Sequence, residues 1–177
     1  ISKLYIIMKS ISITGKNNID KIIHNKDNNK DNFSKRNNVN YQEPSYSEQL
    51  RLINKYYMNQ QDNMETNIIR EIKSKLSGYK NQDIKKHIYH EDKLITLDEI
   101  IEKLVISKLS CFYCKDNVKL LFVMVRDNKQ WSLDRIDNNI CHSNDNTVIC
   151  CLKCNLERRV QNSNNFKFTK QLKIKKV

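Results

Sequence analysis

The sequence predicts an α+β fold, in which a helical N-terminal half precedes a small unit of two strands and one helix. Apolar residues recur every three to four positions between residues 47 and 109, which is the spacing of amphipathic helices. Beyond residue 110 they alternate in two short segments, as expected for strands. One pair of cysteines precedes these segments and another follows them, so the ends of the small unit are expected to lie together.

Composition and charge favour a polyanionic partner and give no sign of a membrane segment. The chain has 177 residues, of which 38% are hydrophobic, and its formal net charge is +12. Such a charge favours nucleic acid, although a composition rich in Lys, Asn and Ile is an alternative explanation. No run approaches the ~18 apolar residues that cross a bilayer, and the apolar run 4–8 is shorter than the about 7–15 residues of a signal-peptide core. We therefore expect an intracellular protein, cytoplasmic or nuclear, with reduced cysteines.

The part of the chain before the cysteines divides into two stretches. Residues 1–46 are rich in Asn, Lys, Asp and Ser, and we expect them to be disordered because they cannot bury enough apolar surface. Residues 47–106 are expected to be helical. One helix should end at Gly78, a residue type common just after helices. The clearest helix begins after Thr96, which with Glu99 matches a capping box, and it carries one apolar face.

The C-terminal unit is expected over residues 107–161. Residues 130–136 predict the first strand, residues 146–151 the second, and residues 151–161 the start of a helix. One face of the first strand is expected to carry Trp131, Leu133 and Ile136.

Four cysteines are spaced as the ligands of a closed tetrahedral zinc site. They form two matched Cys-x2-Cys pairs, namely Cys111 with Cys114 and Cys151 with Cys154. Cys150 is a competing ligand, and disulfides are an alternative use of these residues, but the matched spacing and the reducing compartment favour the four-thiolate site. Cys141 and Cys150 are then expected to pack as small apolar side chains. Zinc would hold the unit folded, since structural zinc contributes about 10–16 kcal/mol in small peptides.

The combined pattern resembles that of the HNH, or ββα-metal, endonucleases. The matching motifs lie within about residues 107–161 and are "C-x2-C", "LDRIDN", "H-x3-N" and "C-x2-CN" followed by two arginines. The likeness is greatest to the zinc-stabilised branch found in phages and large DNA viruses. It implies a metal-dependent DNA endonuclease that hydrolyses phosphodiester bonds, and for a viral member a location in the infected host cell.

The resemblance also implies roles for individual residues. Asp134 and Asn155 would hold a hard divalent cation, Mg²⁺ or Mn²⁺, through oxygens, and Asn146 matches the residue that orients the catalytic loop. The family places its general base directly after the acidic ligand, but here Arg135 stands there and stays protonated. His142 could act as the base from the hairpin loop. Alternatively His142 bonds a phosphate or a neighbouring aspartate, Asp134 caps the loop, and Arg135 holds the scissile phosphate.

The end of the chain, residues 162–177, is a basic tail. Phe166 and Phe168 interleave with its lysines, which predicts a surface that follows a nucleic-acid backbone. The alternative is solvated charge with both rings packed on the domain. Two other functions stay open: a catalytically inactive zinc module that binds nucleic acid or a protein partner, and an assembly role for the helices of residues 47–110.

Overall fold

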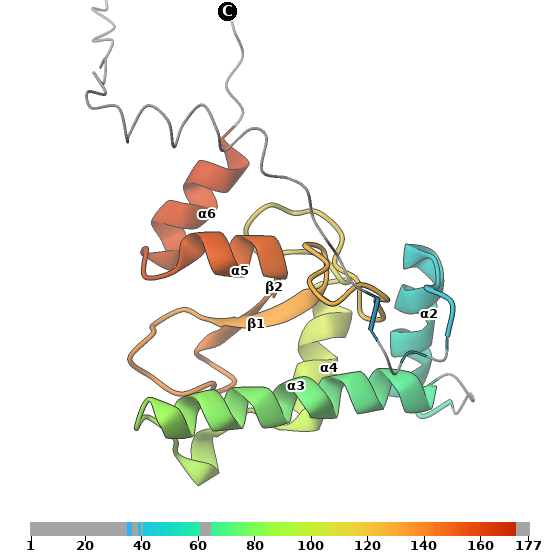
Figure 1. The fold of residues 1–177 in the computed structure, drawn as a ribbon, viewed down its shortest axis with the longest axis horizontal. Helices are drawn as coiled ribbons and strands as arrows, with labels where there is room; N and C mark the ends of the chain where they lie inside the picture. Colours follow the sequence, from blue (N-terminus) through green and yellow to red (C-terminus); the bar gives the residue numbers. More distant parts are fainter. Residues whose placement is uncertain (1–34, 37–38, 40, 61–64, 173–177) are drawn as a thin grey trace, which may run out of the picture. The chain divides into compact units, whose positions relative to one another are not determined.

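The computed structural model describes residues 35–36, 39, 41–60 and 65–172, which belong to one unit of the chain. Helices fill the first half and a two-stranded antiparallel sheet follows, so the predicted α+β class is confirmed (Figure 1). The segment expected to be disordered, residues 1–46, lies largely outside the described residues, as do residues 173–177 of the tail.

Capping side chains fix where the helices of the first half begin. These helices are α2 (Tyr46–Tyr57), α3 (Glu65–Lys85) and α4 (Leu97–Ile106), with a 3-10 turn at Glu91–Lys93 before α4. Ser45 caps α2 by accepting the backbone N–H of Glu48. Thr96 and Glu99 form the predicted capping box at α4. Both helices therefore begin where a side chain satisfies otherwise unpaired backbone N–H groups.

The prediction that a helix ends at Gly78 is wrong, because α3 continues for seven more residues to Lys85. The buried face continues with it, since Ile72, Tyr79 and Asp83 are all buried and follow one another at helical intervals. A glycine inside a helix costs only about 1 kcal/mol relative to alanine, so continued burial outweighs it. The longer helix brings Asp83 beneath the hairpin.

The hairpin consists of β1 (Trp131–Arg135) and β2 (Thr147–Cys151), as the alternation predicts. Trp131 pairs with Cys151 at one end, and Arg135 pairs with Thr147 at the other. Cys151 also caps α5 (Leu152–Arg158), which follows β2 directly, and α6 (Ser163–Gln171) comes next.

Strand β1 is buried on both faces, whereas its sequence alternation predicted only one apolar face. All five of its residues are buried because the hairpin lies between α5 and α3 (Figure 1). From α5, Asn155 donates to the Ser132 hydroxyl, and from α3 the Tyr79 hydroxyl accepts the Leu133 N–H at 2.9 Å. The placement of Ile136 beside Trp131 and Leu133 is wrong, because Ile136 lies beyond the end of the strand and is 43% exposed.

One hydrophobic core joins the helices to the hairpin. It contains Ile53 of α2, Ile72 of α3 and Leu104 of α4 together with Trp131 and Ile149 of the two strands. Among the described residues, no helix is long and apolar enough to cross a membrane.

The predicted basic tail begins with helix α6, which contacts the turn that carries Cys111 and Cys114. Phe166 of α6 is buried and meets the Tyr113 ring edge-on at 5.0 Å, whereas Phe168 is 69% exposed. Lys170 pairs with Glu157 of α5, and Lys167 lies over the Phe112 ring. Only one of the two phenylalanines therefore packs on the domain.

Candidate functional site

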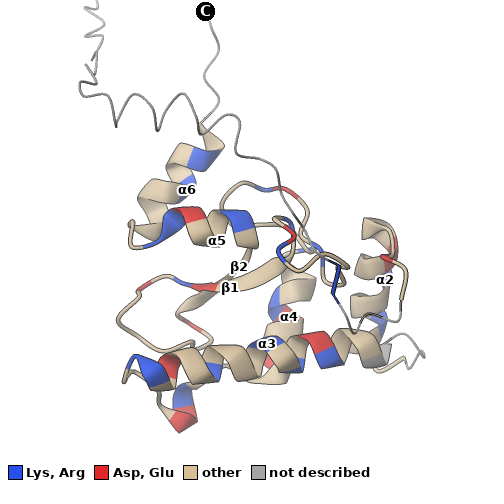
Figure 2. Ribbon diagram, in the orientation of Figure 1, with Lys and Arg blue, Asp and Glu red and all other residues tan. Residues whose placement is uncertain are grey.

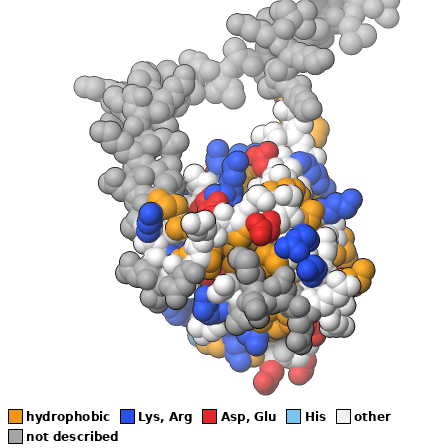
Figure 3. Space-filling model, turned by 90° about the vertical axis from the view of Figure 1, so that its right-hand side faces the viewer, with side chains coloured by type: hydrophobic (Ala, Val, Ile, Leu, Met, Phe, Trp, Pro, Cys, Tyr) orange, Lys and Arg blue, Asp and Glu red, His pale blue; other side chains and the backbone are white. Residues whose placement is uncertain are grey.

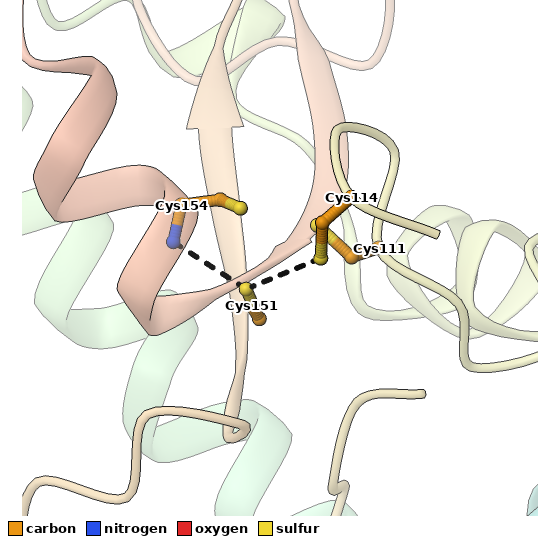
Figure 4. Close-up of side chains that lie close together, drawn as sticks. All are labelled: Cys111, Cys114, Cys151 and Cys154. Atoms are coloured by element: carbon orange, nitrogen blue, oxygen red, sulfur yellow. Dashed lines mark hydrogen bonds between the residues drawn. The ribbon is translucent and has the colours of Figure 1, made fainter. Parts of the chain in front are cut away.

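Four cysteine side chains converge where the turn after α4 meets the start of α5 (Figure 4). Their Sγ atoms all lie within 4.8 Å of one another. They belong to Cys111, Cys114, Cys151 and Cys154. The backbone N–H of Cys154 donates to Sγ of Cys151 at 3.4 Å, which holds this sulfur in place. The predicted grouping of these four residues is confirmed.

The dimensions of the cluster suit a tetrahedral zinc ion. A Zn–S bond of about 2.3 Å in a tetrahedron places the sulfurs about 3.8 Å apart, and the Cys114 and Cys151 sulfurs are 4.0 Å apart. Burial, together with the charges of Cys111 and Cys151, raises the pKa of the Cys114 thiol to about 12. A divalent cation would supply the charge that lets all four thiols ionise, so these residues could hold zinc.

The competing ligand lies outside the cluster. Cys150 points to the other side of β2, where its thiol donates to the Ser132 carbonyl at 3.6 Å, and burial raises its pKa well above the ordinary value. Cys141 is fully buried in the hairpin loop. All six cysteines are free, so no pair is joined in a disulfide. Cys141 and Cys150 thus pack as expected.

Beside the hairpin, a polar cavity of about 320 Å³ brings together four of the predicted site residues. They are Asp134, Arg135, His142 and Asn155. Gln82 and Lys86 reach the cavity from the end of α3, and Arg159 reaches it from beyond α5. The cavity lies apart from the four cysteines, none of which lines it.

The Asp134 carboxylate is held by protein groups on both oxygens. Tyr113 donates to Oδ2 at 2.6 Å, Nε of Arg158 donates to the same oxygen, and Nη2 of Arg158 donates to Oδ1 at 2.7 Å. Arg158 is 1% exposed, and its pKa is raised because the bond to Asp134 outweighs the opposing effect of burial. The positive charge of the Arg158 guanidinium offsets the negative charge of Asp134, which would otherwise attract a metal ion.

His142 is fixed by an aspartate on α3. Its Nδ1 lies 2.7 Å from Oδ1 of Asp83, and its backbone N–H donates to Oδ2 of Asp83 at 2.7 Å. The Tyr79 ring stacks on the imidazole at 4.7 Å. Burial lowers the pKa of His142 below its ordinary value, although the charge of Asp83 opposes this. Arg135 shares the same aspartate, with Nη1 3.4 Å from Oδ1.

The side chains of Asn146 and Asn155 both form hydrogen bonds with the hairpin. The Asn146 side chain accepts the N–H of Asp137 and donates to the carbonyls of Asp137 and Cys141, so it ties the two ends of the β1–β2 loop together. Asn155 donates to Ser132 at 2.7 Å and to the Leu133 carbonyl at 3.2 Å, which orients its amide along β1.

Basic residues surround the cavity. Lys and Arg residues, with acidic residues beside them, lie at the C-terminal end of α3 and on α5, on either side of the hairpin (Figure 2). On the face shown in Figure 3, basic side chains are likewise interspersed with acidic and apolar ones. The positive charge on that face therefore forms no continuous patch.

No protein-family model, curated protein or solved structure matches the chain.

Asp83 is absent from the predicted site, and Arg158 was predicted only as one of two arginines after the motif, not as the partner of Asp134. Asp83 lies 59 positions before His142, and Arg158 lies 24 positions after Asp134, so no local spacing links the partners. The available signal for Asp83 was its place four residues after Tyr79 on a buried helical face, where a carboxylate requires a partner.

Proposed function

We propose that the protein is an HNH-type endonuclease that hydrolyses phosphodiester bonds in DNA. We further propose that a zinc ion bound by four cysteines holds its hairpin in place. The observation that carries this proposal is the single cavity shared by Asp134, Arg135, His142 and Asn155. These residues come from β1, the hairpin loop and α5, which begins at the candidate zinc site.

The lining of the cavity supports a phosphodiester as the substrate. Lys86, Arg135 and Arg159 line it, and guanidinium and ammonium groups bind phosphate oxygens by charge-assisted hydrogen bonds. The net charge of +12 supports a polyanion as the partner. Nucleic acid is the polyanion that combines a phosphodiester with many further phosphate contacts.

His142 supports hydrolysis by general-base catalysis. In the proposed reaction, a water molecule gives a proton to Nε2 of His142 while its oxygen bonds to phosphorus. The bond from phosphorus to the leaving sugar oxygen breaks, and its electron pair stays on that oxygen, which takes a proton from solvent. The imidazolium then returns its proton to solvent.

The divalent cation expected at Asp134 and Asn155 stays a prediction. When bound, such a cation would neutralise charge on the phosphate and on the leaving oxygen. In the described arrangement Arg158 and Tyr113 occupy both carboxylate oxygens, and the only cluster of three or more potential metal-binding side chains among the described residues is the four cysteines. A cation at Asp134 would compete with Arg158 for the carboxylate oxygens.

A second candidate function is a catalytically inactive zinc module that binds nucleic-acid phosphates. The ion pair between Arg158 and Asp134 favours it, because Arg158 already neutralises the carboxylate that would hold a catalytic cation. Both functions predict DNA binding, and only the first predicts cleavage.

A plasmid assay separates the two functions. Supercoiled DNA is incubated with the zinc-loaded full chain in Mg²⁺, in Mn²⁺ or in neither, and DNA binding is measured in parallel. Nicked plasmid supports the endonuclease, and the two metal conditions report whether a cation takes part. Binding without nicking in every condition would leave the inactive module as the function.

A further inference from the structure

We infer that Asp83 on α3 orients His142 as the general base, a role that Arg135 cannot take because it stays protonated. This inference rests on the proposed function. Asp83 contacts His142 and not the substrate, so it acts as a positioning residue.

Asp83 holds both the backbone and the ring of His142. One carboxylate oxygen accepts the backbone N–H and the other lies against Nδ1, each at 2.7 Å. Asp83 is fully buried, so water does not compete for these bonds. The Tyr79 ring, stacked at 4.7 Å, blocks rotation of the imidazole. The ring is therefore held in one orientation.

This contact selects the tautomer that a base requires. An ionised carboxylate only accepts hydrogen bonds, so Nδ1 of His142 carries the proton and Nε2 keeps a lone pair. Within the described part of the chain, no group bonds Nε2, and His142 lines the cavity that also receives Lys86 and Arg159. Nε2 is thus the ring atom available to a water molecule there.

The charged groups around His142 come from α3 and β1. Asp83 faces it from α3, Lys86 from one residue beyond the end of α3, and Arg135 from β1, while the uncharged Tyr79 ring stacks on it. Burial lowers the pKa of His142, Arg135 and Lys86 act in the same direction, and Asp83 acts against them. At neutral pH the ring is therefore uncharged and able to take a proton.

The alternative role for Asp83 is to pin the hairpin loop to α3. The two roles differ in what a near-isosteric change does. Asp83→Asn keeps the size and a hydrogen-bonding oxygen, but it removes the charge that selects the tautomer. A pinning role predicts lost stability with an unchanged rate per folded molecule, whereas the orienting role predicts a slower rate in folded protein.

The test compares Asp83→Asn with Asp92→Asn, a matched change of an exposed acid on the 3-10 turn. We expect Asp83→Asn to lower kcat for plasmid cleavage by about 10²–10⁴-fold, the usual share of a general base, while DNA affinity stays within about threefold. Because the lost charge lowers the pKa of His142, the acid limb of the kcat profile should also move to lower pH. Asp92→Asn should change neither quantity. A wild-type kcat in folded Asp83→Asn would overturn the inference.

A second measurement needs no cleavage and no variant. Nitrogen-15 NMR of the histidines in the zinc-loaded wild type should show His142 protonated at Nδ1 and unprotonated at Nε2 at neutral pH. Protonation at Nε2 would overturn the inference even if Asp83→Asn does not fold. If the wild type never cleaves DNA while this tautomer is present, the proposed function fails and the aspartate–histidine contact stands.

Discussion

Replacing Arg158 by methionine should destabilise the fold by about 3–5 kcal/mol, the usual effect of breaking a buried ion pair. Arg158 donates five hydrogen bonds, of which two go to Asp134 and the others to groups of the hairpin and the turn after α5. Methionine retains much of the volume but leaves the Asp134 carboxylate buried with only the Tyr113 hydroxyl as a described partner. Since a domain of this kind is stable by about 5–15 kcal/mol, the loss is a large fraction of the total.

The assay is urea unfolding at a fixed zinc concentration, because bound metal adds to the apparent stability. Arg159→Met is the matched control, since Arg159 is exposed and its removal should change the free energy of unfolding by about 0.5 kcal/mol or less. Adding Asp134→Asn to Arg158→Met should restore part of the loss by removing the unpaired charge. An unfolding free energy of Arg158→Met within about 1 kcal/mol of wild type would refute the buried-pair reasoning.

Three further outcomes are expected. Elemental analysis of the purified protein should find one zinc per four-cysteine cluster. The Cys151→Ser variant should lose this zinc, whereas Cys141→Ser should keep it. Equal zinc content in both variants would contradict the ligand assignment. Zinc affinity, measured by chelator competition, should fall as the pH falls, because protons compete with zinc for the thiols, among them Cys114, whose pKa is raised by burial and by the charges of Cys111 and Cys151. An affinity that is constant from pH 8 to 6 would exclude thiolate ligation. Lys86→Ala should weaken DNA binding and reduce the slope of the logarithm of the DNA-binding constant against the logarithm of salt concentration by about 0.9. Lys85→Ala, which changes the adjacent lysine outside the cavity, should have less effect. Equal effects would mean that the cavity does not bind phosphate.

The sequence predicted the cysteine cluster and the hairpin because local patterns encode both. The Cys-x2-Cys spacing places two sulfurs on one turn, and alternation along β2 directs neighbouring side chains to opposite sides, so that Cys151 lies inside the cluster and Cys150 outside it. The capping box at Thr96 is equally local. Each pattern spans only a few residues, whereas Cys114 and Cys151, which the cluster brings together, lie 37 positions apart in the sequence.

The partners of the site residues could not be predicted, because they depend on tertiary packing. Whether Asp134 is open to a metal depends on where the side chain of Arg158 lies, and whether His142 is oriented depends on α3 extending past Gly78. The expectation that His142 bonds an aspartate is met by Asp83 of α3, far from the hairpin in sequence. Long-range contacts of this kind leave no periodicity or spacing in the chain.

The single-turnover rate of plasmid cleavage by His142→Ala, measured beside the exposed control His87→Ala, tests the proposed endonuclease most directly. We expect His142→Ala to cleave about 10²–10⁴-fold more slowly than wild type, while zinc content and DNA affinity stay the same and His87→Ala keeps the wild-type rate. Wild-type protein that binds DNA but does not cleave it, or cleavage by His142→Ala at the wild-type rate, would contradict a nuclease site built on His142.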